Sequence, residues 1–219
     1  MKKNGIKLLV FDWDGTLADS TALIVDAMQA AISQLQYQTR SDAQIRDIIG
    51  LGLVEAAQTL FPKMKREGHE MIGSCYRLHY AQRAHETSLF PDVPDILRTL
   101  QERGYRMAIA TGKSRRGLDN SLRQTALEGI FHATRCADET CSKPHPQMLH
   151  EILDELNIHP DHAVMIGDSV YDMEMALQAG VSPIAVSYGV HDSARLLKYQ
   201  PLACLDSLAD LLNWPTATH

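Results

Sequence analysis

The sequence lacks any hydrophobic run long enough to cross a membrane. A transmembrane helix needs about 20 consecutive apolar residues, and no such run occurs in the 219 residues. The chain begins with Met1-Lys2-Lys3, but the apolar segment that follows extends only from Leu8 to Phe11 and then meets aspartates. That segment is too short for the core of a signal peptide. We therefore expect a cytoplasmic protein that does not contact a membrane.

Cysteine and concentrated positive charge are also scarce. The four cysteines form no C-x-x-C pair, and no Cys/His spacing fits a structural zinc site. A chain of this size needs no disulfide bonds, so we expect reduced thiols. The formal net charge is -6, and basic clusters are no longer than Arg115-Arg116. Binding to a nucleic-acid backbone requires clustered cations, so we expect no nucleic-acid partner.

What the chain does contain is an alternation of buried strands and amphipathic helices. Hydrophobic residues make up 45% and charged residues 22%, which is typical of a globular protein. Short apolar runs without strict polar alternation indicate strands that are buried on both faces. They occupy 7–11, 106–110, 163–166 and 183–186, with a weaker candidate at 133–136. Helical patterns lie between them, and Gly104 and Gly180 are placed as C-terminal caps. This order predicts an α/β fold with a doubly wound, Rossmann-like parallel sheet.

One interval breaks the alternation. Roughly ninety residues between the first strand and the strand at 106–110 have a pattern that is almost entirely helical. Ser20 is the candidate N-cap of a first helix, Gly50 and Gly52 mark a loop, and 53–60 and 63–86 are the next helical stretches. We predict a helical cap domain at residues 17–83, inserted into a discontinuous α/β core of residues 1–16 and 84–219.

Polar side chains gather where the predicted strands end. Ligands of an open parallel sheet bind at the carboxyl ends of its strands. Three strands end there in polar residues, and the loop after the weak strand adds a lysine. The candidate site residues are Asp12, Asp14, Thr111, Gly112, Lys143, Asp168 and Asp172.

This set of side chains suits a metal ion and a phosphate group. Asp12 and Asp14 are two residues apart, so their side chains can point the same way, and crowded carboxylates repel one another. A divalent cation removes that conflict, and Mg²⁺ prefers carboxylate oxygens and water. Lys143 supplies a positive charge and Thr111 a hydroxyl donor, which together suit an oxyanion such as phosphate.

The motifs resemble those of the haloacid-dehalogenase-like hydrolases. The similar segments are Phe11-Asp12-Trp13-Asp14-Gly15-Thr16-Leu17, Ala110-Thr111-Gly112-Lys113, Lys143-Pro144, and Gly167-Asp168-Ser169 with Asp172. Their order and spacing match from about Leu8 to about Gly189, including the helical insert. Lys143-Pro144-His145-Pro146 and Ser187-Tyr188-Gly189 look like the bacterial phosphoglycolate-phosphatase-like branch. Many relatives have Asn where this chain has Gly112, and Gly where it has Asp92.

The resemblance implies a role for each matching residue. Asp12 would be the nucleophile that becomes an aspartyl phosphate, and Asp14 the general acid and base. Thr111, Gly112 and Lys143 would bind the phosphoryl group. Mg²⁺ would be held by the Asp12 carboxylate, the Asp14 backbone carbonyl and the Asp168 carboxylate, with Asp172 acting through water or by orienting its neighbours. The loop Gly50-Leu51-Gly52 is the candidate substrate-facing loop.

The function expected from these residues is a Mg²⁺-dependent phosphatase acting on a small phosphorylated metabolite. A phosphomutase would share the core motifs, and only the cap and water access would separate the two. A dehalogenase on this fold would need neither Asp14 nor a metal, and a phospho-accepting signalling domain would need no lid. A non-catalytic binding protein is the remaining alternative. The substrate and the oligomeric state, monomer or weak dimer, stay open.

Each motif by itself also has a plain structural interpretation. Asp168-Ser169 alone reads as a helix cap, and Lys143 alone as a solvated lysine. In the insert, Cys75-Tyr76-Arg77 and His79-Tyr80 either face the site or pack and solvate the cap. Only the joint occurrence of the motifs in this order favours chemistry over the plain interpretations.

Overall fold

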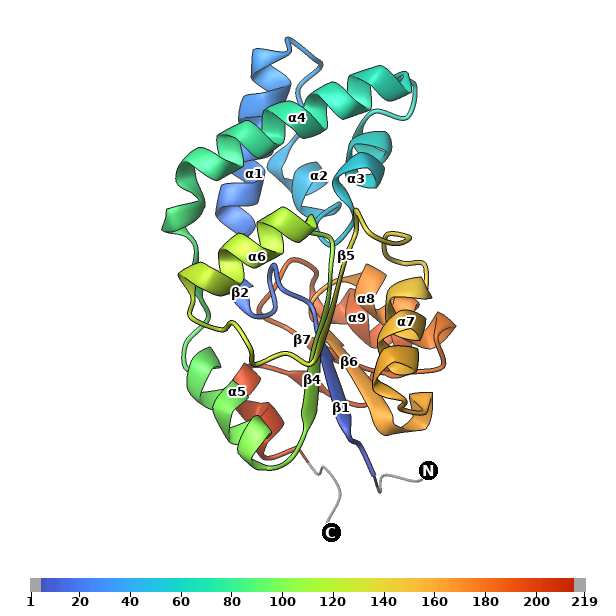
Figure 1. Cartoon of the computed structure of the whole chain (residues 1–219). Coiled ribbons are helices and arrows are strands. Elements are labelled where there is room, and N and C mark those ends of the chain that lie inside the picture. The colour runs from blue at the N-terminus through green and yellow to red at the C-terminus, as the bar shows by residue number, and fades with distance from the viewer. Residues whose placement is uncertain (1–4, 215–219) are drawn as a thin grey trace.

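The computed structural model describes residues 5–214, and its centre is a six-stranded parallel sheet (Figure 1). The strands run in the order β5-β4-β1-β6-β7-β8, and every neighbouring pair is parallel. Their bounds are β1 Leu8–Phe11, β4 Arg106–Thr111, β5 Ala133–Cys136, β6 Ala163–Gly167, β7 Ser182–Val186 and β8 Cys204–Leu205. The predicted fold class is confirmed, and the short edge strand β8 is an addition to it.

Helices cover both faces of this sheet because alternate strand residues point to opposite sides. Leu9 and Phe11 of β1 belong to one buried cluster, which includes apolar residues of α5. Leu8 and Val10 belong to a second, which includes residues of α7 and α8. Burial of these side chains from water is the main favourable term for the layers. The helices of this part are α5 Val93–Glu102, α6 Arg115–Gln124, α7 Gln147–Leu156, α8 Val170–Gln178 and α9 Ser193–Leu196.

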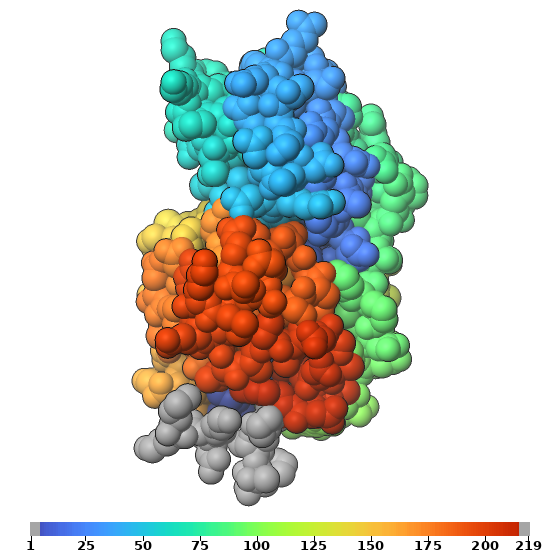
Figure 2. Space-filling model, turned by 180° about the vertical axis from the view of Figure 1, so that it is seen from behind, coloured from blue at the N-terminus to red at the C-terminus, as the bar shows by residue number. Residues whose placement is uncertain are grey.

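A separate group of helices lies between β1 and β4 in the sequence. These are α1 Thr21–Gln34, α2 Asp42–Arg46, α3 Leu53–Leu60 and α4 Arg66–Arg83, and we call them the cap. They enclose their own cluster of buried residues, which includes Met28, Ile45 and Ile72. Figure 2 shows the cap, in blue and cyan, seated directly on the orange and red part of the core. The helix α2, absent from the sequence prediction, begins at a capping box formed by Ser41 and Gln44.

The chain enters and leaves the cap through two adjacent short strands. β2 Ala18–Asp19 and β3 Ser88–Leu89 pair in antiparallel fashion, with Ala18 opposite Leu89. Neither strand was predicted, because two residues give no periodic signal. Short 3₁₀ helices complete the described elements: η1 Ala84–Glu86, η2 Pro160–His162, η3 Leu197–Tyr199 and η4 Leu208–Leu212. Within residues 5–214, no helix has the length and apolar character that a membrane crossing requires.

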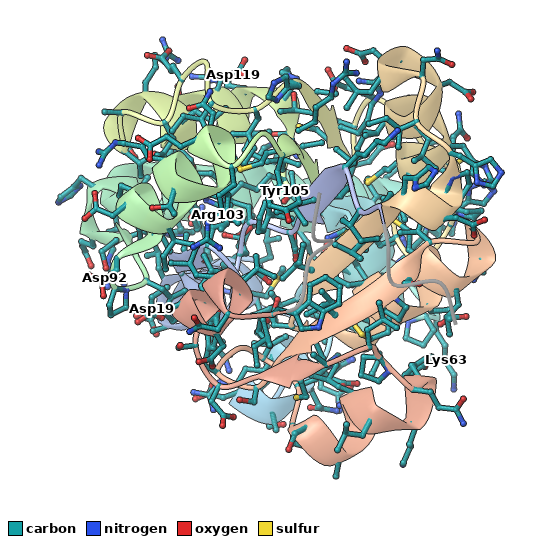
Figure 3. All side chains as sticks on the ribbon, turned by 90° about the horizontal axis from the view of Figure 1, so that it is seen from below. Asp19, Lys63, Asp92, Arg103, Tyr105 and Asp119 are labelled. Atoms are coloured by element: carbon teal, nitrogen blue, oxygen red, sulfur yellow. The ribbon has the colours of Figure 1, made fainter. Side chains whose placement is uncertain are left out.

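The two turns that flank α5 each contain a residue with a positive φ, one a glycine and the other an aspartate. Gly104, the predicted cap, adopts φ +83° just after the helix, a conformation that favours glycine. Asp92 precedes the helix with φ +61°, which is costly for a residue with a side chain and less so for Asp. Asp92, where many relatives have Gly, thus adopts a left-handed conformation. At this lower end of the core, Arg103 donates to the Leu212 carbonyl at 2.6 Å (Figure 3).

Candidate active site

The carboxyl ends of β1, β4 and β6 meet beneath the cap. Asp12 directly follows β1, and its backbone N–H donates to the Ile166 carbonyl of β6 at 2.9 Å. This bond extends the pairing of the two strands to the start of the loop. The Asp12 carboxylate is 1% exposed, and its Oδ1 accepts from the Trp13 backbone N–H at 2.6 Å. The nucleophile expected from the sequence is therefore fixed by the sheet itself.

Three carboxylates form one buried cluster. Asp12, Asp168 and Asp172 each bring an oxygen to within 4.8 Å of the others. Asp168 accepts from the Thr16 hydroxyl and from the Val190 backbone N–H, both at 2.8 Å. These two donors hold the carboxylate in one orientation. The sequence placed all three residues at the same edge of the sheet, and the structure brings them together there.

Two glycines make room for Asp168. A Cβ on Gly15 or on Gly189 would overlap the Asp168 carboxylate, so no larger residue fits at either position. Gly15 also has φ +83°, a conformation that favours glycine. Gly189 follows Tyr188, whose hydroxyl donates to the Thr16 carbonyl at 2.9 Å. Tyr188 and Gly189 therefore pack beside the loop that follows β1 and beside Asp168, whereas the Ser187 hydroxyl donates to Asp206.

Lys143 lies inside the cluster rather than beside it. Its Nζ is 2.8 Å from Asp12 Oδ1 and 2.7 Å from Asp172 Oδ1, and the side chain is fully buried. Burial disfavours the ammonium, but attraction to Asp12 and Asp172 outweighs it and raises the pKa of Lys143 above its ordinary value. Asp172 is oriented by Ser169, whose hydroxyl donates to its Oδ2 at 2.6 Å. Asp172 thus contacts the lysine directly, which the sequence did not indicate.

The electrostatics of the cluster favour a bound cation. Burial raises the pKa of Asp12 well above its ordinary value; Lys143 opposes this shift, while Asp172 and Asp168 add to it. Within the described residues, the buried Asp12 Oδ2 has no hydrogen-bond partner. A buried carboxylate oxygen without a donor is costly, and a hard cation among carboxylate oxygens would satisfy it. The donor set therefore fits Mg²⁺, with Asp12 and Asp168 as side-chain ligands.

Binding of Mg²⁺ is expected to weaken by about tenfold per pH unit as the pH falls below about 7. Burial, and then the neighbouring Asp172, raise the pKa of Asp168 to about 7, so protons compete with the metal. Calorimetric titration of the protein with MgCl₂ across this range measures the effect. An affinity that does not change with pH would contradict it.

In the metal-free chain, Asp168 is expected to stabilise the fold less as the pH rises. A carboxylate whose pKa is lowered by folding has the reverse effect. The pKa of Asp168 is raised from 3.8, so between about pH 4 and 7 the folded chain binds more protons than the unfolded chain. Its contribution to the free energy of unfolding therefore falls as the pH rises through this window. Since Mg²⁺ offsets that loss, it should raise Tm more at about pH 8 than at about pH 5. Thermal denaturation with MgCl₂ or EDTA tests this, and an equal rise at both values would contradict it.

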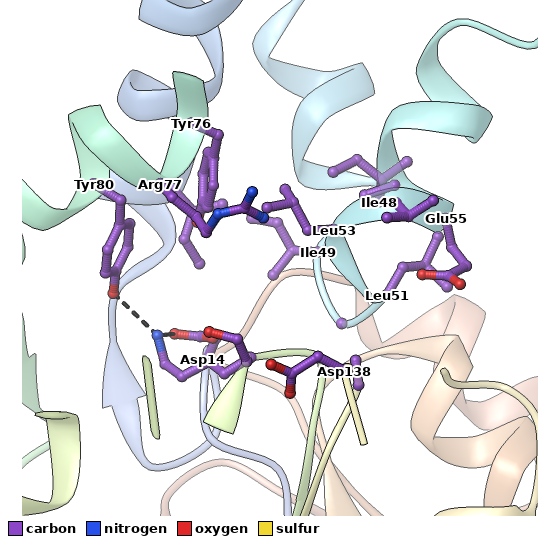
Figure 4. Close-up of a pocket in the computed structure, with 18 of the residues that line it drawn as sticks. Asp14, Ile48, Ile49, Leu51, Leu53, Glu55, Tyr76, Arg77, Tyr80 and Asp138 are labelled. Atoms are coloured by element: carbon purple, nitrogen blue, oxygen red, sulfur yellow. Dashed lines mark hydrogen bonds and ion pairs between the residues drawn. The ribbon is translucent and has the colours of Figure 1, made fainter. Parts of the chain in front are cut away.

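Asp14 faces the other way, toward the cap. Its Oδ1 accepts from the Ser20 hydroxyl at 2.6 Å and is 3.1 Å from Lys113 Nζ. Ser20 stands at the predicted N-cap of α1, but it makes no capping hydrogen bond with its side chain. Lys113 also donates to the Tyr80 hydroxyl of α4 at 3.1 Å (Figure 4). The expected acid and base is therefore tied to the cap through a lysine that the sequence interpretation left out of the site.

Thr111 ends β4, and Gly112 follows it and lies against the cap loop, the segment Gly50-Leu51-Gly52. Thr111 is fully buried, and its hydroxyl accepts from the Lys113 backbone N–H at 3.2 Å. A Cβ on Gly112 would come within 2.5 Å of the Leu51 carbonyl oxygen and 2.8 Å of the Gly50 carbonyl oxygen. Glycine at this position, where relatives often have Asn, lets the cap loop approach the backbone. Of the candidate substrate loop Gly50-Leu51-Gly52, Gly50 and Leu51 line the cavity between the cap and the core.

A cavity of about 500 Å³ lies between these core residues and the cap. Asp12 and Asp14 form its floor, and Tyr76, Arg77 and Tyr80 of α4 line it from above (Figure 4). Tyr76, Arg77 and Tyr80 therefore face the site, which was one of the two interpretations of these segments. The other residues of the same segments lie elsewhere. Cys75 lines a separate hollow of the cap, and His79 hydrogen-bonds to Gln34 Oε1 at 2.7 Å.

Asp47, at the end of α2, joins the cap to the core. Its carboxylate Oδ1 is 2.5 Å from Arg195 Nη1 and 3.4 Å from His191 Nε2. Its backbone carbonyl accepts from the Tyr171 hydroxyl at 2.8 Å. On the opposite side of the loop, the Gly52 backbone N–H donates to Ser142 Oγ at 2.6 Å. The structure therefore has the cap closed on the core, held by contacts on both sides of the cap loop.

Replacing Asp47 with alanine is expected to lower kcat/KM by roughly 2- to 5-fold, because the change removes an ion pair that exists only when the cap is closed. Glu70→Ala is the matched control, since Glu70 pairs with Arg66 on the exposed surface of α4. Steady-state kinetics on both variants separates the two cases. Equal activities would mean that the Asp47 contact does not favour closure.

Comparison with known proteins gives consistent matches along almost the whole chain. A family model described as haloacid dehalogenase-like hydrolase matches residues 9–186. A phosphoglycolate phosphatase from Vibrio vulnificus (strain YJ016) is 28% identical over 222 residues, covering 97% of each chain. Pyrophosphatase PpaX from Bacillus pumilus (strain SAFR-032) is 28% identical over 213 residues, again covering 97% of each. A crystal structure of a haloacid dehalogenase-like hydrolase from Bacteroides fragilis superposes with a TM-score of 0.88 at 28% identity, covering 94% of this chain and 99% of that one.

Proposed function

Because this chain belongs to the haloacid dehalogenase-like hydrolases, we propose that it is a Mg²⁺-dependent phosphatase that hydrolyses a small phosphate monoester through an aspartyl phosphate on Asp12. The observation that carries the proposal is the placement of two carboxylates on the floor of one cavity beneath the cap. Asp12 lies 2.8 Å from a buried lysine, and Asp14 lies beside it with its side chain toward the cap. In the proposed mechanism Asp12 attacks phosphorus and Asp14 exchanges a proton with the leaving oxygen.

The first step transfers the phosphoryl group to the enzyme. A carboxylate oxygen of Asp12 forms a bond to phosphorus while the bond to the ester oxygen breaks. Asp14 gives its proton to the departing oxygen, so the alcohol leaves neutral. Lys143, the Thr111 hydroxyl and the Gly112 backbone N–H bind the phosphoryl oxygens. When bound, Mg²⁺ supplies positive charge against the phosphoryl oxygens and the carboxylates.

The second step returns the enzyme to its starting state. Asp14, now ionised, takes a proton from a water molecule, and the water oxygen attacks phosphorus as the bond to Asp12 breaks. Lys113, whose Nζ lies 3.1 Å from Asp14 Oδ1, holds this carboxylate in place for the transfer. Asp172 positions Lys143 through its 2.7 Å contact. Inorganic phosphate then leaves when the cap opens.

We also propose that residues 17–83 act as a distinct cap domain over a core of residues 1–16 and 84–219. The separate buried cluster of α1–α4 supports this division. So does the paired entry and exit of the chain at β2 and β3. In this arrangement the cap excludes water from Asp12 and selects the leaving group.

The experiment that tests the function is phosphate release from a panel of phosphate monoesters and from pyrophosphate, with MgCl₂ and with excess EDTA. Phosphoglycolate and pyrophosphate enter the panel because relatives are named for them. Sugar phosphates and nucleotides complete it. Release that depends on Mg²⁺ is the expected result. A folded protein that releases phosphate from none of the esters would overturn the proposal.

A further inference from the structure

The cavity above Asp12 is large for the compounds named in the relatives. Its volume of about 500 Å³ falls within the roughly 300–1,000 Å³ that drug-sized ligands occupy. Glycolate, or the second phosphate of pyrophosphate, would fill a small part of it. The cap is already closed here, with the Leu51 carbonyl against Gly112 and Asp47 paired with Arg195. The volume therefore belongs to the closed state and is not produced by an open lid.

The upper walls of the cavity are mainly apolar. Five aliphatic or thioether side chains of the cap line it: Ile24, Met28, Ile48, Ile49 and Leu53. The rings of Tyr76 and Tyr80, whose centroids are 5.7 Å apart, line it as well. Water gains few hydrogen bonds against such walls, so an apolar group that displaces it binds favourably. A leaving group made only of polar atoms would leave these surfaces without a partner.

Three positively charged residues line the cavity, and Arg77, an exposed residue of α4, is the one that the cap contributes. Arg77 lines the cavity, and Figure 4 shows its guanidinium turned toward the middle, above Asp14 in that view. In residues 5–214 it has no ion-pair partner, and its side chain donates one hydrogen bond, to Ser74 Oγ at 3.0 Å. Glu55 and Asp138 lie toward the other end of the cavity and would repel an anion there. An anionic substituent is therefore directed to Arg77.

We infer that the leaving group of the substrate combines an apolar body with a carboxylate. The body packs between Leu53 and the ring of Tyr76, and the carboxylate binds Arg77. A single guanidinium matches the one charge and the two oxygens of a carboxylate. This inference rests on the proposed phosphatase function, and it makes Arg77 a specificity-determining residue of that site.

The test compares phosphate monoesters of primary alcohols, so that leaving-group acidity stays similar. The probes are ethyl phosphate, benzyl phosphate, 3- and 4-carboxybenzyl phosphate, phosphoglycolate and, separately, pyrophosphate. We expect kcat/KM for benzyl phosphate to exceed that for ethyl phosphate. The better carboxybenzyl isomer should exceed benzyl phosphate by roughly 10-fold or more, as a hydrogen-bonded charge pair would give.

Arg77→Met keeps most of the side-chain length and removes the charge. It should lower kcat/KM for the carboxybenzyl ester by roughly 10-fold and leave benzyl phosphate unchanged. Arg116→Met is the matched control, because Arg116 also lines the cavity, from the core side, and forms no ion pair within the described residues. It should keep the preference for the carboxybenzyl ester over benzyl phosphate. Leu53→Ala should reduce the preference for benzyl over ethyl phosphate.

The outcomes separate the inference from the function on which it rests. The inference is wrong, and the phosphatase function is kept, if two results occur together. Phosphoglycolate or pyrophosphate would be hydrolysed far better than both carboxybenzyl esters. Arg77→Met would lower kcat/KM for the carboxybenzyl esters no more than for benzyl phosphate. A loss of the carboxylate preference in Arg116→Met but not in Arg77→Met would also overturn it. Failure of every ester with Mg²⁺ present would remove the phosphatase function as well.

Discussion

Replacing Asp12 with asparagine is expected to lower phosphate release by roughly 10⁴-fold or more while the chain stays folded. The amide has nearly the shape of the carboxylate, but it does not form the bond to phosphorus on which the two-step route depends. The Trp13 backbone N–H still has an oxygen to donate to, at the position of Oδ1. The change therefore removes the nucleophile and its negative charge while keeping the side-chain shape and the contact with the Trp13 backbone.

The stability of this variant follows from the pKa of Asp12. Burial raises that pKa well above its ordinary value, so the ionised form is disfavoured in the folded chain. The folded state therefore loses stability from this group as the pH rises above the unfolded value of 3.8. A neutral amide avoids that loss. Without metal, Asp12→Asn should have a Tm equal to or above that of the native chain at neutral pH.

Phosphate release and thermal denaturation, measured on the same preparation, check both statements. Asp154→Asn is the matched control, because Asp154 is exposed on α7 and distant in sequence from every motif. It should keep full activity. A variant at Asp12 that retains most of its activity would contradict the nucleophile assignment. A variant that is inactive because it is unfolded would contradict the expected stability.

Replacing Lys143 with methionine is expected to abolish activity and to lower the free energy of unfolding by about 3–5 kcal/mol at neutral pH. The lysine is fully buried between Asp12 and Asp172, at 2.8 and 2.7 Å. Methionine fills a similar volume but leaves these carboxylates and Asp168 without a compensating charge. The loss should be smaller at low pH, where the carboxylates are protonated, and smaller with Mg²⁺, which binds them.

Urea denaturation at about pH 5 and about pH 8, with and without MgCl₂, measures this pattern. Lys198→Met is the control, since Lys198 is exposed and should change stability by no more than about 0.5 kcal/mol. If Lys143→Met unfolds at the same urea concentration as the native chain under all conditions, the lysine does not hold the carboxylate cluster together.

The features that the sequence predicted well are those with a local signal. Buried parallel strands such as β1 and β6 are continuous apolar runs, and their polar ends mark the site edge because all strands of such a sheet point one way. The helix α3 could also be predicted from a local signal, because it lies between Gly52 and Pro62, which mark its two ends. Elements of few residues, such as β8 and α2, carry too little pattern to be recognised.

Features that depend on contacts between distant residues were not readable. Ser20 has the residue type and place of an N-cap, yet its hydroxyl bonds to Asp14 instead. Lys113 follows a recognised motif, but its link to Tyr80 joins residues 33 positions apart. The size of the cavity and the direction of Arg77 depend on how four cap helices pack, and helical periodicity alone does not fix that packing.

The adjacent strands β2 and β3 also bear on how this kind of protein can diversify. Since Ala18 of β2 lies opposite Leu89 of β3, the two ends of the intervening polypeptide leave this pair of strands from almost the same point. A different insert with neighbouring ends can be grafted at this ribbon without altering the order of the six parallel strands. Substrate choice can then change by exchange of a whole module, while the reactive aspartates stay where β1 and β6 put them.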